Sequence, residues 1–394
     1  MKIYLPVVTA LVLASGGALA APAQPDLSES AINAATFSDW RTRQDEAARD
    51  TPEDGRTPDG KAAGNEATGG EAEEDASAEG EGTDAARTED RSDASSDQTD
   101  EATRSENENT DTPADPFLVR LQVLLDRAHA SPGVIDGRAG GNTDKAIRAF
   151  EEMRGLKADG AVDEELWSAL MSDEAPVVRS YTLTQEDVDG RYVKDLPSDY
   201  GALAKLDWIG YRGPEEMLAE RFHMDEDFLR ELNPGADFGN AGTQILVTDP
   251  GAEPQTKVAR IVISKSRGEL FAYDENDKVV IAAPATIGSG DTPSPSGTMK
   301  VNGSAQEPTY EYDPDKNFQQ GKNKKELTLP PGPNGPVGIV WIDLAKPTYG
   351  IHGTPDPSEI GKTASHGCVR LTNWDARALS KLILPARTVV RFEK

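Results

Sequence analysis

Residues 51–115 contain no valine, isoleucine, leucine, methionine, phenylalanine, tryptophan or tyrosine. The same segment carries 21 acidic and 5 basic residues, a net charge of −16. Without apolar side chains to bury, a segment cannot offset the entropy that it loses on ordering. We therefore predict a disordered, self-repelling linker over 51–115. Either it lets the downstream modules reach through a porous polymer layer, or it is a dispensable spacer.

The folded modules must lie mainly after this linker. A chain of 394 residues has room for two or three domains. The linker supplies more than half of the total formal charge of −28, so the folded remainder is only moderately acidic. An acidic chain lacks the clustered lysine and arginine that neutralise phosphates, which argues against nucleic acid as a partner.

The N-terminus has the pattern of a signal peptide, residues 1–20. Lys2 supplies a positive charge, an apolar stretch follows over 3–17, and Ala18-Leu19-Ala20 matches a cleavage site. The apolar run is short for a membrane span, although an uncleaved anchor is the alternative. We expect an exported protein, in the periplasm and associated with the cell wall.

The first compact module is expected at 116–172. Apolar residues recur at helical spacing in two stretches, and repeated Asp-Gly turns predict three helices joined by tight loops. The order LQVLLDRA…GVIDGRAGGNTDKAIRAFEEMRGLKADGAVDEELWSAL resembles the three-helix peptidoglycan-binding domain. The resemblance implies binding to the wall, and a spacer domain is the alternative.

A second module is expected at 181–250. The stretch PEEMLAERFHMDEDFLRELNPGADFGNAGTQILVTDPG predicts helix, helix and strand, although an opening strand is not obvious. This order resembles the LysM type of glycan-binding module. His223 lies in the helix pair, where a lone histidine is more often packed or exposed than functional.

From residue 257 to 393 the pattern is mostly β, with one helix near 373–382. Residues 305–334 are rich in proline, glycine, lysine and asparagine, and we expect a long loop there of the kind that often acts as a functional lid. The fold class is thus multidomain α+β: a three-helix domain, a small LysM-like module and a mostly-β C-terminal domain.

Cys368 is the only cysteine of the chain. With no disulfide partner in the chain, it is a small buried hydrophobe, half of an intermolecular disulfide, or a reactive thiol. A thiol near neutral pH needs a base to become a nucleophile. His366 is two positions away and His352 is sixteen, and spacing alone leaves the choice open. The N–H groups of Gly367 and Cys368 are candidate oxyanion donors.

The segments HGT at 352–354 and SHGCVR at 365–370 resemble the signature of the L,D-transpeptidase catalytic domain of the YkuD type. The similarity extends over 257–392 and includes TPSPSGTMKV and GIVWIDL. It implies that Cys368 is the nucleophile and His352 the proton donor and acceptor. The other motif positions are expected to shape the site, supply oxyanion donors and contact substrate carboxylates: Gly353, Thr354, Ser365, His366, Gly367 and Arg370.

The resemblance implies no cofactor and no metal, although His352, His366 and Cys368 could in principle hold a zinc ion. It also implies that peptidoglycan stem peptides and glycan are the partners, and that the reaction is 3–3 cross-linking through a thioester. Two alternatives use the same thioester: an L,D-carboxypeptidase, and an enzyme that attaches the lysine of an outer-membrane lipoprotein to the wall. A third, of a different class, is a non-catalytic wall-binding protein.

Overall fold

The computed structural model of the chain describes residues 25–50, 112–289, 292–316 and 318–394. The predicted signal peptide and nearly all of the predicted linker lie outside these ranges. Within the described ranges, no helix is long and apolar enough to cross a bilayer. The three expected modules fall inside them, apart from residues 290–291 and 317.

Helices form the first module, and local capping marks where they begin and end. The Asp115 carboxylate accepts a hydrogen bond from the N–H of Phe117 at the start of α3. Gly155 ends α4 in the left-handed conformation, with φ of +71°. Phe117 also packs against Phe37 of an N-terminal helix pair, α1 and α2. The helices are α1 (Glu29–Ala34), α2 (Phe37–Asp50), α3 (Pro116–Arg127), α4 (Gly141–Arg154) and α5 (Glu164–Leu170).

The second module is a two-stranded antiparallel sheet with helices between its strands. β1 places Val178 opposite Thr248 of β2. Of the residues on β1 only Val178 is fully buried, so the strand has too little apolar alternation to be recognised in the sequence. It begins before residue 181, where the module was expected to start. The elements are β1 (Val178–Thr182), α6 (Gln185–Val188), α7 (Tyr200–Leu203), α8 (Pro214–Arg221), α9 (Glu226–Leu232) and β2 (Gln244–Thr248).

An eight-stranded sheet, in the order β11-β10-β9-β6-β12-β3-β4-β5, forms the C-terminal domain. The helix α10 has the predicted bounds and packs against β9 and β10. The first module covers the edge strand β5, since the Ser131 N–H donates to the Ala282 carbonyl at 2.8 Å. The elements are β3 (Arg260–Ser264), β4 (Glu269–Tyr273), β5 (Val279–Pro284), β6 (Gly297–Gln306), β9 (Val340–Leu344), β10 (Gly350–His352), β11 (Val369–Arg370), α10 (Asn373–Leu382) and β12 (Val389–Glu393).

The stretch expected to be a long loop, 305–334, has more regular structure than its composition predicts. Strand β6 extends into it as far as Gln306. A short hairpin follows, in which β7 (Tyr310–Tyr312) pairs with β8 (Leu327–Leu329) in an antiparallel register. Such a short hairpin is marginal alone, so it depends on packing against other parts of the chain.

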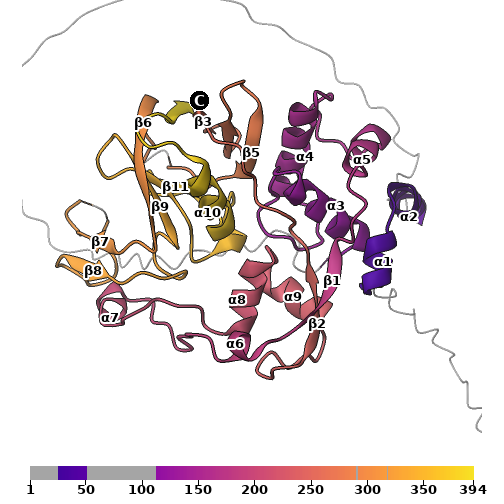
Figure 1. The fold of residues 1–394 in the computed structure, drawn as a ribbon, viewed down its shortest axis with the longest axis horizontal. Helices are drawn as coiled ribbons and strands as arrows, with labels where there is room; N and C mark the ends of the chain where they lie inside the picture. The colour runs from indigo at the N-terminus through magenta and orange to yellow at the C-terminus, as the bar shows by residue number, and fades with distance from the viewer. Residues whose placement is uncertain (1–24, 51–111, 290–291, 317) are drawn as a thin grey trace, which may run out of the picture.

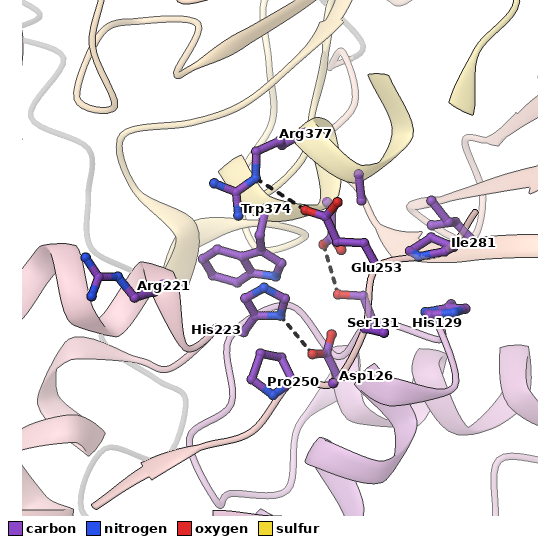
Figure 2. A pocket seen from close by; sticks show the side chains of 15 residues that line it. Asp126, His129, Ser131, Arg221, His223, Pro250, Glu253, Ile281, Trp374 and Arg377 are labelled. Atoms are coloured by element: carbon purple, nitrogen blue, oxygen red, sulfur yellow. Dashed lines mark hydrogen bonds and ion pairs between the residues drawn. The ribbon is translucent and has the colours of Figure 1, made fainter. Parts of the chain in front are cut away.

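The three modules meet around Trp374 (Figure 2). The His223 ring stacks on Trp374 with centroids 4.9 Å apart, and its Nδ1 lies 2.8 Å from the Asp126 carboxylate. The Ser131 hydroxyl donates to Asp375 at 2.9 Å. These groups line a cavity of about 190 Å³. His223 is thus packed, and it joins all three modules through its part-buried contact with Asp126 and its stacking on Trp374.

A second contact between modules buries the carboxyl group of Glu220, on α8. The Asn373 side-chain amide donates to both of its oxygens at 3.0 Å, and the Tyr211 hydroxyl donates at 3.1 Å. Burial raises the pKa of Glu220 to about 8, although these hydrogen bonds oppose the shift. The folded protein therefore holds this carboxyl protonated at neutral pH.

Folding should take up this proton between about pH 4.5 and 8, because the folded pKa of Glu220 is the higher one. The stability that it contributes is fully present below about pH 4.5. It is lost as the pH rises through 8, at up to about 1.4 kcal/mol per pH unit. We expect the difference in melting temperature, Glu220→Gln minus wild type, to increase by at least about 5 °C from pH 5 to pH 9. The matched control is Glu215→Gln, on the same helix, and an equal change in both variants would contradict the assignment.

Candidate active site

Two parallel strands bring both motif segments to one edge of the sheet. His352 at the end of β10 lies opposite Arg370 of β11. Cys368 immediately precedes β11, so it lies beside the strand that carries His352. His352 is buried, 5% exposed, whereas His366 is exposed. The fold thus places the more distant histidine in sequence, and not the nearer one, in the interior next to the cysteine strand.

His352 is held in one orientation by its own neighbours. Its Nδ1 lies 2.7 Å from the Gly353 carbonyl, and its ring stacks on Trp341 with centroids 5.5 Å apart. A carbonyl only accepts, so Nδ1 carries the proton and Nε2 keeps its lone pair. Burial lowers the pKa of His352 to about 3, and the Arg370 charge adds to this, while the bond to Gly353 opposes it. The imidazole is therefore neutral at neutral pH and can accept a proton at Nε2.

Cys368 is partly buried, and its thiol contacts the Thr348 carbonyl at 3.6 Å. Burial raises the pKa of the Cys368 thiol, against a hydrogen bond from the Gly350 backbone and the charge of Arg370. The resting site therefore combines a protonated thiol with a neutral imidazole. Thr348 has φ of +71°, a conformation that is uncommon for residues other than glycine and that is often found at functional sites.

The loop that presents Cys368 is closed by Ser365. The Ser365 hydroxyl donates to the Cys368 carbonyl at 2.5 Å and accepts from the Gly367 N–H at 3.2 Å. Gly367 has φ of +111°, which requires glycine and turns its N–H toward Ser365. In this structure the Gly367 N–H is engaged within the loop, and its role as an oxyanion donor stays a prediction.

Arg370 is the positive charge of the site. It lies close enough to both His352 and Cys368 to lower the pKa of each. A cation at this position favours the thiolate and disfavours a resting imidazolium. It is also suited to bind a carboxylate of a ligand beside the thiol.

Gly353 and Thr354 shape the end of the HGT segment. A Cβ atom on Gly353 would lie 2.1 Å from the Asn373 side-chain oxygen, so only glycine fits against the start of α10. Thr354 is buried, and its hydroxyl accepts from the Asp356 N–H at 3.2 Å. Both residues therefore hold the backbone that follows His352.

Two residues beside the site were not singled out from the sequence. Ser294 is buried, and its hydroxyl donates to the Gly367 carbonyl at 2.7 Å. The Phe318 ring stacks on His366, with centroids 4.5 Å apart and planes inclined by 16°. The only signal for Ser294 was its place in the segment TPSPSG. Phe318 lies in a stretch whose composition predicted only a loop.

The structure does not group His352, His366 and Cys368 as the ligands of a zinc ion. Throughout the described part of the chain, no three side chains of histidine, cysteine, aspartate or glutamate lie together as a metal site would need. His352 and Cys368 instead point toward separate backbone carbonyls, those of Gly353 and Thr348.

Two parts of the chain match families of known proteins. Residues 258–391 match the L,D-transpeptidase catalytic domain, and residues 115–170 match a putative peptidoglycan-binding domain. A putative L,D-transpeptidase YkuD of Bacillus licheniformis is 32% identical over 171 residues, which cover 43% of this chain and 87% of that protein. A probable L,D-transpeptidase YbiS of Escherichia coli is 31% identical over 208 residues, 50% of this chain and 67% of that one.

Among solved structures, an L,D-transpeptidase mutant of Enterococcus faecium superposes with a TM-score of 0.27 at 18% identity. The match covers 35% of this chain and 50% of that chain, so the present protein spans half the length of that neighbour. A superposition of this quality supports no comparison of individual residues.

Proposed function

The chain belongs to the L,D-transpeptidase family, and we propose that it forms 3–3 cross-links in peptidoglycan through a thioester on Cys368. The observation that carries this proposal is the placement of a buried, neutral His352 on the strand next to the only thiol of the chain. A base whose Nε2 is unprotonated at neutral pH can take the thiol proton at the moment of attack.

In the first proposed step, Cys368 Sγ bonds to the carbonyl carbon of the third residue of a tetrapeptide stem. Its proton passes to Nε2 of His352, and the tetrahedral intermediate collapses as the bond to the terminal D-alanine breaks. The imidazolium returns the proton to the departing amine. The products are a thioester on the enzyme and free D-alanine.

In the second step, the side-chain amine of diaminopimelate on another stem attacks the thioester. His352 accepts a proton from this amine, and the sulfur leaves and is reprotonated by the imidazolium. Arg370 is placed to hold a stem carboxylate during both steps. Each step uses the same base once as acceptor and once as donor, which leaves the enzyme unchanged.

The other modules support a role at the wall. The matched peptidoglycan-binding domain and the transpeptidase domain together make peptidoglycan the substrate. We also propose that the second module is LysM-like and binds glycan, because its helices lie between two antiparallel strands that pair with each other. The pattern of residues 1–20 supports export to the periplasm.

Incubation of the mature protein with purified muropeptides, followed by mass spectrometry, tests the proposal. We expect dimers joined through residue 3 of the donor stem, together with free D-alanine. Tripeptide monomers alone would identify an L,D-carboxypeptidase instead. A muropeptide joined through residue 3 to the lysine of an added lipoprotein, without dimers, would identify a wall-anchoring enzyme. No conversion, with Cys368→Ala equal to wild type, would leave only a wall-binding protein.

A further inference from the structure

A small hydrophobic cluster joins the second module to the catalytic domain, apart from the two larger cores. One half comes from residues 196–211 of the second module, which we call the strap. The other half comes from residues 310–316 and 318–334 of the catalytic domain, which we call the aromatic loop. Leu203 and Ile209 of the strap and Tyr312 and Leu329 of the aromatic loop are all buried there. Figure 1 shows the strap helix α7 beside β8.

Polar contacts fasten the first end of the strap to the aromatic loop. The Tyr200 N–H donates to the Gln320 side-chain oxygen at 3.0 Å, and the Gln320 amide donates to the Ser198 carbonyl at 3.0 Å. The Asn323 amide donates to the Asp199 carboxylate at 2.8 Å. Three side chains and two backbone groups thus fix the position of the strap relative to the aromatic loop.

The other end of the strap is fastened through its backbone. The Ile209 N–H donates to the Pro331 carbonyl at 2.9 Å, and the Asn334 N–H donates back to the Ile209 carbonyl at 3.1 Å. The Asn334 amide adds a bond to the Gly210 carbonyl at 3.0 Å. A Cβ atom on Gly332 would lie 2.1 Å from the Ile209 oxygen, so this close approach of two backbones requires glycine.

Aromatic contacts continue from the strap to the motif that holds the cysteine. The Tyr200 ring makes edge contacts with Tyr310 and Phe318, each with centroids 6.1 Å apart. Phe318 in turn stacks on His366, two residues before Cys368. Tyr200 is therefore two aromatic contacts from the SHGC segment, although it belongs to another module.

The same tyrosines lie within the electrostatic field of the site. Burial raises the pKa of Tyr310, and the charges of Tyr200 and Cys368 add to this. Burial raises the pKa of Tyr200 to about 12, and the Arg370 charge opposes the shift. Both hydroxyls stay protonated at neutral pH, and the charge of Arg370, the cation proposed to hold a stem carboxylate, acts on both.

We infer that the strap forms part of the acyl-donor site: Tyr200 is a positioning residue that holds Tyr310 and Phe318 of the aromatic loop as one wall of the stem-peptide cleft. The inference rests on the proposed function, because the ligand is the stem peptide. The β7–β8 hairpin is too short to be rigid by itself, and the strap supplies the packing that it lacks. The second module therefore helps to select the donor peptide and is more than an independent wall anchor.

Competition between a free tetrapeptide stem and a carbapenem for Cys368 in the full chain tests this. The carbapenem reports on the thiol and its base, and the slowing of adduct formation gives the apparent tetrapeptide affinity without measuring cross-linked product. We expect Tyr200→Ala to raise the tetrapeptide inhibition constant about tenfold, equivalent to about 1.4 kcal/mol. The carbapenem rate without peptide should stay within about twofold. Tyr200→Phe keeps the ring and should restore tetrapeptide affinity to within about twofold of wild type.

Two further variants distinguish a specific effect on tetrapeptide binding from a general loss of folded structure. Gln320→Ala removes the bonds to Tyr200 and Ser198 but leaves the cluster intact, and should weaken tetrapeptide binding about threefold. Tyr192→Ala is the matched control, because the Tyr192 hydroxyl bonds only within the second module, to the Asp187 carbonyl, and it should match wild type.

The inference is overturned if the wild type binds no tetrapeptide, or if its affinity is unchanged in both Tyr200→Ala and Gln320→Ala. It is equally overturned if the carbapenem rate falls together with tetrapeptide affinity in both variants, since that would show a purely structural role. Failure of the proposed function has a different signature. In that case tetrapeptide competition is normal in the wild type, but no 3–3 dimer forms from muropeptides.

Discussion

Cys368→Ala should form no covalent adduct with a carbapenem and should convert no muropeptide. The physical reason is that the thioester needs a sulfur nucleophile and the chain has no second thiol that could replace it. Removal of a nucleophile typically costs several orders of magnitude, and we expect a loss of at least about 10³-fold in product formation. Intact-protein mass spectrometry measures the adduct, and chromatography of the digested products measures conversion.

The single cysteine makes this experiment unusually clear, because a wild-type adduct can contain only one modified thiol. The control is wild-type protein unfolded in denaturant, whose free Cys368 reports the reactivity of a thiol without the site. We expect its adduct to form much more slowly than in the folded chain. Residual conversion by Cys368→Ala at more than about a tenth of the wild-type rate would falsify the thioester pathway.

The chemical groups of the site could be predicted because they lie in two short, contiguous motifs. Residue identity and chain order suffice to recognise HGT and SHGC, and both lie at strand ends where the structure brings them together. The helix α10 was also predictable at its observed bounds. Thr372 caps it by accepting from the Asp375 N–H, and its apolar positions recur at helical spacing.

The choice of base could not be made from spacing, because it depends on burial. His366 is nearer to Cys368 in the sequence, yet the turn at Gly367 leaves it exposed, whereas the pairing of β10 with β11 buries His352. The family resemblance pointed to His352, and the fold supplies a physical reason. The bond from the Gly367 N–H to Ser365 likewise depends on the geometry of this turn and could not be predicted from the sequence.

The contacts of the strap could not be predicted from the sequence, because they join distant parts of the chain. Tyr200 and Gln320 are 120 positions apart, and the stretch around Gln320 has few apolar residues of its own. The aromatic loop lacks the periodicity that marks a core-facing element. Their shared cluster exists only when both segments are folded, so composition predicted a loop where the structure has a packed interface.

His352→Ala should slow carbapenem acylation of Cys368 by about 10² to 10⁴-fold, which is the usual contribution of a positioned general base to the rate. Its pH dependence should change as well. In the wild type the imidazole is neutral above about pH 3 and the thiol stays protonated because burial raises its pKa, so acylation should be nearly flat between about pH 5 and 8. Without the base only the thiolate fraction reacts, so the rate should rise about tenfold per pH unit.

The comparison that separates the two histidines is His366→Ala. His366 is exposed and stacks on Phe318, so its loss should reduce acylation by less than about tenfold and leave the profile flat. His129→Ala, at the junction between modules, is the matched control and should react like the wild type. A flat profile in His352→Ala, or a steep one in His366→Ala, would transfer the role of base from His352 to another group. The slope is the stronger test, because a merely distorted site would lose rate without acquiring a dependence on hydroxide.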